Sequence, residues 1–324
     1  MTSNADTSTT PSAVEKGSSL WVDALVRLRK NKLAVAGAII IGLILLLCFV
    51  VAPILSMSGL DGNKQNLENR FAGIGESGVF GTDQLGRDLL IRVLEGGQIS
   101  LIVAILATFL TVTIGVIYGG IAGYVGGRVG NVMMRIVDGL LAMPFLIIVI
   151  LFRELITEHI DDGARFLVND WGWDNDTVMR FAALIPLTIA IAAFGWLSMG
   201  RIVRSAAASL SKQEFVEAAR SLGLSHQRIL LRHILPNMLG PVIIYATLTI
   251  PSFILYEATL SFIGLGIEPP NASWGKLIKE GASYLETNTV VLAIPAILFS
   301  LTLFAFNFLG DGLRDALDPK ASKD

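Results

Sequence analysis

The chain has little charge for its length. Only 16% of its 324 residues are Asp, Glu, Lys or Arg, whereas soluble domains carry roughly 25%. Hydrophobic residues make up 53% of the sequence, and the mean hydropathy is +0.64. These values exclude an ordinary soluble domain and indicate an integral membrane protein.

Residues that commonly build catalytic or redox sites are scarce as well. The one cysteine, Cys48, lies in an apolar run and cannot form an intrachain disulfide. The three histidines, His159, His226 and His233, lie outside the apolar runs and belong to no zinc or nucleophile motif. The sequence also lacks the GxxxxGK(S/T) loop that cradles nucleotide phosphates. We therefore expect no enzymatic activity, no metal or other cofactor bound by this chain, and no nucleic-acid partner.

Long apolar runs, in contrast, are abundant. About 20 mainly apolar residues are needed to cross a hydrocarbon core of about 30 Å, and six segments qualify. The third is the weakest, because Arg135 and Asp138 lie in its first turns. The predicted fold is an all-α membrane protein with six transmembrane helices. We place the spans at Leu33–Leu55, Gln98–Tyr124, Val132–Phe152, Phe181–Gly200, Met238–Ile263 and Thr289–Gly310.

The N-terminal region divides into two parts. Residues 1–18 are rich in Ser and Thr, and we interpret them as a disordered cytoplasmic tail. Residues 19–32 form an amphipathic pattern with a basic end, which predicts an interfacial elbow helix leading into the membrane. The remaining boundaries are 33–97 for the first span and a periplasmic segment, 98–313 for a core domain, and 314–324 for a cytoplasmic tail.

Basic residues set the orientation. Those beside the first span favour a cytoplasmic N-terminus by the positive-inside rule, and six spans return the C-terminus to the same side. With this orientation, the inside segments hold most of the 25 Lys and Arg residues. The basic segment between spans four and five then lies inside.

That segment, residues 214–237, reads as two short helices. Apolar residues fall on one face of the first helix, while Glu214, Glu217 and Arg220 keep it polar elsewhere. Gly223 can end this helix in a left-handed conformation, and Ser225 can cap a second helix that Pro236 should stop. The predicted contact face consists of Phe215, Ala218, Ala219 and Leu222.

Two interpretations of the segment remain open. As a lipid-surface helix, it would use its arginines to attract anionic headgroups. A protein-docking element accounts better for the Gly hinge and for the two alanines on the contact face. The residues Glu217-Ala218-Ala219, with Gly223 beyond them and Leu235-Pro236 at the close, resemble the EAA loop of bacterial ABC import permeases. We call residues 214–237 the coupling segment.

Further motifs narrow the resemblance to the C-type permease subunit of the dipeptide, oligopeptide and nickel importer family. The stretch before span two is similar to the GTDxxGRD signature of that family, and the stretches after spans five and six resemble its LSFLGLG, SWG and C-terminal patterns. The signature residues are Gly81, Thr82, Asp83, Gly86, Arg87, Asp88, Asp311, Arg314 and Asp315. Asp83, Arg87 and Asp88 could cap a helix start and pair with one another, or form a periplasmic surface for a binding protein. Asp311, Arg314 and Asp315 should anchor the cytoplasmic end of span six.

The resemblance implies a type I ABC importer permease fold in the bacterial inner membrane. It also implies several partners: a homologous permease subunit in a heterodimer, two ATPase subunits that hold ATP and Mg, an extracytoplasmic substrate-binding protein, and membrane lipid. Transport of peptides is expected, with nickel or another small solute as the alternative. A membrane-embedded enzyme would need paired catalytic groups, and a secondary transporter would need several intramembrane carboxylates; the sequence offers neither.

Two other features attract attention. Glu257 lies deep in span five, where an ionisable group is a candidate for the translocation pathway; a structural pairing, with the backbone or with the partner permease, is the alternative. Arg153–Arg180 is acidic and longer than the outside turn that the family leads us to expect. We interpret it as a solvated loop, with docking of a binding protein as the second interpretation. Its acidic residues lack EF-hand spacing.

Overall fold

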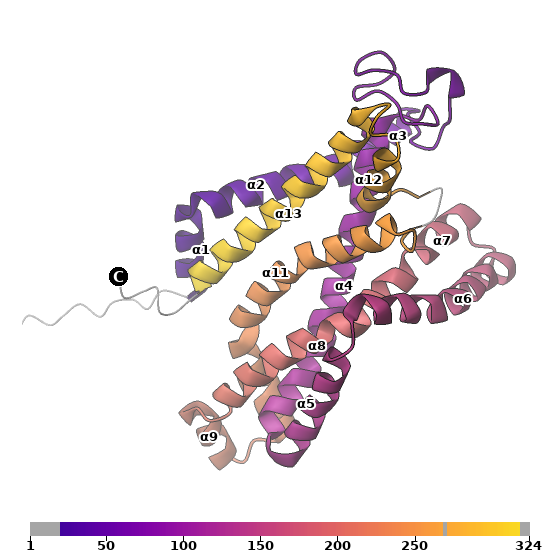
Figure 1. Cartoon of the computed structure of the whole chain (residues 1–324). Helices are drawn as coiled ribbons and strands as arrows, with labels where there is room; N and C mark the ends of the chain where they lie inside the picture. Colours follow the sequence, from indigo (N-terminus) through magenta and orange to yellow (C-terminus); the bar gives the residue numbers. More distant parts are fainter. Residues whose placement is uncertain (1–19, 268–270, 318–324) are drawn as a thin grey trace, which may run out of the picture.

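The computed structural model describes residues 20–267 and 271–317, which are helical throughout most of their length (Figure 1). Within the described ranges, extended pairing is limited to one isolated bridge before α4. The predicted all-α architecture is confirmed. The predicted tail at 1–18, and most of the one at 314–324, lie outside the described residues.

The helices follow in chain order. They are α1 (Leu20–Lys30), α2 (Lys32–Leu46), α3 (Ala52–Met57), α4 (Leu89–Val125), α5 (Gly127–Leu141), α6 (Phe145–Trp171), α7 (Asn175–Ala182), α8 (Ile185–Leu210), α9 (Glu214–Ser221), α10 (His226–Ile229), α11 (Leu235–Phe262), α12 (Trp274–Ala282) and α13 (Thr289–Leu317). A π-helical turn joins α2 to α3, and a second joins α10 to α11, so each pair continues as one span.

Five of the six predicted spans appear as long apolar helical segments. Each extends beyond its predicted limits at one end or both. The segments are Lys32–Met57, Leu89–Val125, Thr177–Leu210, His226–Phe262 and Thr289–Leu317. The predicted elbow helix is α1, which packs against α13. Asn31 begins α2 by accepting hydrogen bonds from the backbone amides of Leu33 and Ala34.

The third span differs from its prediction. Val132–Phe152 is not one helix, because α5 and α6 meet at an angle of 92°. The break falls before Pro144, which cannot continue the hydrogen-bond ladder of α5 and instead stands at the N-cap of α6. Only the bent pair taken together brings the described spans to six.

The acidic segment Arg153–Arg180 is also helical, and its prediction as a solvated loop is wrong. It continues α6 to Trp171, turns at Gly172 with a positive φ of 68°, and forms most of α7. Its acidic residues are interspersed with apolar ones that pack α6 against α7 around Ala164 and Val178. Asp174 caps α7, and hydrogen bonds from the side chain and backbone of Thr177 lower the pKa of its carboxyl group.

The centre of the molecule is α4, which runs alongside α8 (Figure 1). Gly115, Gly119 and Gly123 lie one turn apart on α4 and face α8. A Cβ atom at Gly119 would overlap the carbonyl oxygen of Gly200. Small residues at this spacing let two helix backbones approach closely in a membrane. The glycines therefore explain how these two spans pack.

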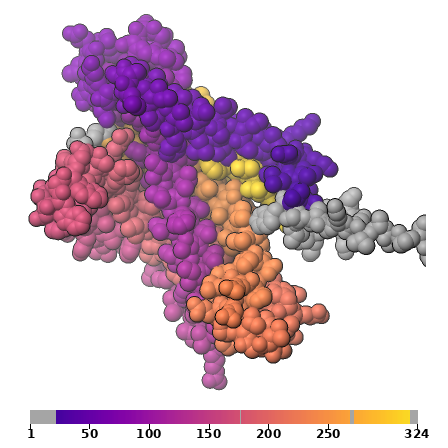
Figure 2. Space-filling model, turned by 180° about the vertical axis from the view of Figure 1, so that it is seen from behind, coloured from indigo at the N-terminus to yellow at the C-terminus, as the bar shows by residue number. Residues whose placement is uncertain are grey.

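The remaining spans pack around this pair. α11 lies against α4, α8 and α13, and α2 lies along α13. Figure 2 shows the indigo N-terminal helices covering much of the yellow α13. The largest apolar core lies where α4, α8, α11, α12 and α13 meet, around Trp274, Leu101, Ile191 and Ile254. A second core of buried residues links α9 and α10 to α8 and α11.

Candidate functional site

The coupling segment lies at one end of the bundle, where α9 is labelled in Figure 1, and several of its apolar side chains are exposed. Phe215 and Leu222 are 40% and 80% exposed, and Ala218 lies between them, also exposed. We call these three residues the apolar ridge. They lie at positions i, i+3 and i+7, which share one helix face. Glu214, Glu217 and Arg220 surround the ridge with charge and are exposed as well.

One member of the predicted contact face lies elsewhere. Ala219 is 5% exposed and turns inward with Val216, which is fully buried in the second core. A helix as short as α9 is held by its tertiary contacts, and this pair supplies them. The sequence prediction missed Val216, because Phe215 and Val216 stand side by side between Glu214 and Glu217, and the pattern does not show which of the two faces inward.

The turn after α9 is as predicted. Gly223 has a φ of +76°. Its N–H donates to the carbonyl oxygen of Arg220, and the N–H of Leu224 donates to that of Ala219. These two bonds define a Schellman motif, in which glycine at the C′ position avoids a steric penalty. Ser225 then caps α10 by accepting from the N–H of Arg228, at 3.4 Å.

Pro236 does not stop the second helix, contrary to the prediction. It lies in the first turn of α11, where a missing N–H is tolerated, and the π-helical turn Leu230–Ile234 precedes it. Leu235 packs on the second core. The helix that begins at His226 therefore runs to Phe262 as one segment. The second helix of the coupling segment is thus continuous with the fifth span.

Tyr124, at the end of α4, holds the coupling segment from the other side. A hydrogen bond of 2.7 Å joins its Oη atom to Nδ1 of His226, and the guanidinium of Arg220 lies 5.4 Å from its ring centre. Sequence analysis found only that His226 belongs to no zinc or nucleophile motif, and it did not pair this residue with Tyr124. The position of an aromatic residue at the end of a predicted span was the one signal that could have indicated this contact.

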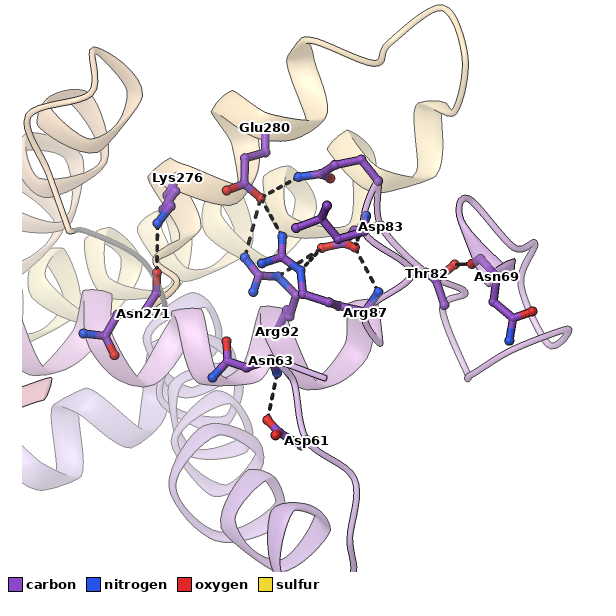
Figure 3. A network of polar contacts seen from close by, with 12 residues as sticks. Asp61, Asn63, Asn69, Thr82, Asp83, Arg87, Arg92, Asn271, Lys276 and Glu280 are labelled. Atoms are coloured by element: carbon purple, nitrogen blue, oxygen red, sulfur yellow. Dashed lines mark hydrogen bonds and ion pairs between the residues drawn. The ribbon is translucent and has the colours of Figure 1, made fainter. Parts of the chain in front are cut away.

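The GTDxxGRD stretch lies at the opposite end of the molecule and forms a charged network with α12 (Figure 3). Asp83 is 1% exposed, and its carboxylate lies 2.7 Å from Nε of Arg87 and 3.3 Å from Nε of Arg92. Glu280 of α12 lies 3.4 and 3.5 Å from the two guanidinium groups and accepts from the side-chain amide of Gln84. We call these five residues the α4–α12 network.

The other signature residues shape the same stretch. Thr82 donates from its hydroxyl to the carbonyl oxygen of Asn69, and Asp88 caps α4 by accepting from the N–H of Ile91. Gly81 and Gly86 adopt positive φ values, and a Cβ atom at either would overlap a neighbouring backbone carbonyl. Capping and internal pairing therefore occur, as one of the two interpretations expected. A contact with a binding protein stays a prediction.

The signature residues of the last span lie apart from both sites. Asp311, Arg314 and Asp315 are exposed near the end of α13, which continues beyond the predicted boundary at 313. Figure 1 shows this end beside α1 and away from α9. Gly312 packs closely against Ala34 of α2, so the helix end is fixed on the first span.

Glu257 is fully buried near the end of α11 that lies far from the coupling segment, and its carboxylate accepts hydrogen bonds from Ser100 and Ser261. A role in the translocation pathway stays a prediction. Among the described residues, no three His, Cys, Asp or Glu side chains gather in a way that could hold a metal ion.

Comparison with known proteins gives consistent results. The family described as "Binding-protein-dependent transport system inner membrane component" matches residues 112–323. The family described as "N-terminal TM domain of oligopeptide transport permease C" matches residues 19–73. A structure of the MetNI methionine ABC transporter, facing inward, superposes with a TM-score of 0.50 at 21% identity, over 71% of this chain and 96% of that one. The type I ABC importer permease fold is thereby confirmed.

Several curated relatives match over nearly the whole chain. The "Oligopeptide transport system permease protein OppC" of Haemophilus influenzae is 44% identical over 305 residues, which cover 94% of this chain and 90% of that protein. The protein of the same name from Escherichia coli strain K12 is 41% identical, with 94% and 93% covered. The "Dipeptide transport system permease protein DppC" of Bacillus subtilis is 39% identical, with 92% and 85% covered. This multi-pass membrane protein belongs to the family of binding-protein-dependent transport system inner membrane components.

Proposed function

We propose that this chain is a permease subunit of an ATP-driven importer of oligopeptides or dipeptides, in which it forms half of the translocation pathway. The observation that carries the proposal is the identity of 44% to an oligopeptide permease across 94% of this chain. The dipeptide permease at 39% identity supports the same substrate class. These relatives give no support to nickel as the solute, so peptides are the substrate that we propose.

The assembly that we propose contains a homologous permease, two ATPase subunits and an extracytoplasmic binding protein, in the bacterial inner membrane. ATP and Mg would be held by the ATPase subunits, because this sequence has no phosphate-binding loop. Both termini and the coupling segment would face the cytoplasm, as the distribution of Lys and Arg favours. In this orientation the α4–α12 network faces the outer compartment.

The coupling segment would be the part of this chain on which the ATPase subunits push. Its apolar ridge suits a groove in an ATPase subunit, since exposed apolar residues inside a polar rim are typical of interface centres. The Schellman turn and the second core fix α9 on the start of the fifth span. A push on the ridge would therefore move α11 as a rigid body, which is the kind of change that alternating access requires.

Two substitutions test this coupling in the complete complex, reconstituted in proteoliposomes. Labelled peptide is supplied on the side of the membrane where the binding protein docks. Gly223→Pro removes the N–H that donates to Arg220 and cannot adopt the φ of +76°. Glu217→Lys reverses an exposed charge beside the ridge. Both should leave ATP hydrolysis measurable while peptide uptake per ATP falls about tenfold or more, because the first distorts the turn that positions the ridge and the second reverses a charge at its rim.

The matched control is Gly240→Ala in α11, where an added Cβ atom meets nothing within 4 Å and φ is ordinary. It should transport normally. If both test variants import peptide with normal yield per ATP, the coupling segment has another role. Uptake of nickel but not of peptide by the unaltered complex would overturn the substrate class.

A further inference from the structure

The carboxylate of Glu257 is held in a polar cluster that the coupling mechanism does not use. The side chain comes from α11 and is fully buried. Its two oxygens each accept a hydrogen bond of 2.7 Å, one from the hydroxyl of Ser100 on α4 and one from the hydroxyl of Ser261 on α11. Each oxygen of the carboxylate therefore has a hydrogen-bond donor within this chain.

The hydrogen bonds continue from the two serines to the first turn of α12. The backbone N–H of Trp274 donates to the hydroxyl of Ser100 at 3.2 Å. The hydroxyl of Ser273 donates to that of Ser261 at 3.2 Å, and itself accepts from the N–H of Lys276 at 3.3 Å. In both series of hydrogen bonds, every donor thus points toward the carboxylate of Glu257. Because helix N–H groups carry partial positive charge, the start of α12 and Glu257 attract each other through the serines.

The helices around the cluster approach one another closely at two glycines. A Cβ atom at Gly275 would overlap the backbone of Ala258 on α11, and one at Gly97 of α4 would lie 2.7 Å from the ring of Trp274. The indole N–H of Trp274 donates to the carbonyl oxygen of Val93 on α4, at 3.0 Å. The start of α12 is therefore pressed onto both α4 and α11.

The same helix carries the charged network at its other end. Glu280 meets Gln84, Arg87 and Arg92, so α12 connects Glu257 to the stretch before α4 (Figure 3). α11, in turn, leads without a break to the coupling segment. One continuous set of contacts therefore joins the two ends of the molecule.

We propose that Glu257 is a positioning residue that locks α12 to α4 and α11, so that a binding protein pressing on the α4–α12 network and an ATPase pressing on the coupling segment act on one rigid body. The proposal rests on the function proposed above and gives Glu257 a structural link in place of a solute contact. The occupant of the outer surface is the peptide-loaded binding protein.

Distance measurements between spin labels test the lock directly in the assembled complex. Labels at Leu106→Cys on α4 and Ser283→Cys after α12 occupy exposed positions, whereas the native Cys48 is fully buried. The distance distribution should be narrow in the unaltered chain and clearly broader in Glu257→Gln and Ser273→Ala. Thr259→Val is the matched control, because the Thr259 hydroxyl bonds only to Leu255 of its own helix and its loss should change nothing.

The functional readout is stimulation of ATP hydrolysis by peptide-loaded binding protein. Glu257→Gln exchanges one acceptor oxygen for an NH2 donor, so one of the two serine hydroxyls that donate to the carboxylate loses its acceptor. The variant should retain basal hydrolysis and lose stimulation about tenfold, the scale of one buried hydrogen bond left unmade. Unchanged distances overturn the proposal, and unchanged distances with lost uptake assign Glu257 to the solute pathway. A complex that never hydrolyses ATP overturns the proposed function alone, because the distance measurement stands without it.

Discussion

The coupling segment and the α4–α12 network are built in opposite ways. The coupling segment exposes its apolar ridge and its charges, and its shape comes from backbone bonds around Gly223. The network instead buries charged groups and pairs them within the chain, with Asp83 and Arg92 each 1% exposed. An exposed apolar surface is typical of a site that binds a partner, and substitutions there should affect binding. Breaking a buried ion pair instead lowers the stability of the chain itself. The two ends should therefore respond differently to substitution.

The largest effect is expected at the network. Asp83→Ala would leave the guanidinium groups of Arg87 and Arg92 with half of their partners, and breaking a buried ion pair costs about 3–5 kcal/mol. The purified protein should unfold at a clearly lower temperature. Asp61→Ala is the control, since the exposed Asp61 carboxylate accepts a hydrogen bond only from the backbone N–H of Asn63 (Figure 3). This substitution should change stability by no more than ~0.5 kcal/mol. Equal thermal stability of the two variants would remove the contrast drawn above.

Neighbouring residues of α9 sharpen the comparison at the other end. Val216→Ala removes buried methyl groups from the second core and should cost about 2 kcal/mol of stability, measured by chemical denaturation. Phe215→Ala, one residue earlier and 40% exposed, should leave stability within ~0.5 kcal/mol. It should instead weaken binding of the ATPase subunit about tenfold or more in a copurification titration. The reverse pattern would place Phe215 inside the fold and Val216 at the interface.

The smallest effect concerns the tie between α4 and α10. Tyr124→Phe keeps the ring beneath Arg220 but removes the hydrogen bond to His226, a loss of about 1 kcal/mol. Amide hydrogen exchange in α10 should become faster. Tyr118→Phe is the matched control, because Tyr118 donates to the carbonyl oxygen of Met133 in α5 and not to the coupling segment. Faster exchange in both variants would mean that α4 as a whole has loosened.

Periodicity and backbone chemistry made much of the molecule predictable. Long apolar runs predicted five of the spans, and Gly223 with Ser225 predicted the turn of the coupling segment, because these signals are local. The bend at Pro144 was less accessible, since a proline within an apolar run reads either as a kinked span or as two helices. Tertiary contacts decided between the two.

Errors at 214–237 and 153–180 have a common origin. Val216 and Ala219 are buried because α8, α10 and α11 happen to cover that side of α9, and no spacing within a short helix records which face is covered. In Arg153–Arg180, charge suggested a loop, but the apolar residues between the charges pack on α7. The α4–α12 network joins residues far apart in the chain, and no single motif could have revealed Glu280 as its member.

The length of α4 has a consequence for how this protein meets its bilayer. A helix of 37 residues is about 55 Å long, and even a tilt of ~40° leaves roughly 42 Å along the membrane normal against an acyl layer of about 30 Å. Several of its turns must therefore stand in water or among headgroups. The second span therefore has length to spare when acyl chains lengthen or shorten, and Arg92 lies in the first turn at one end of it.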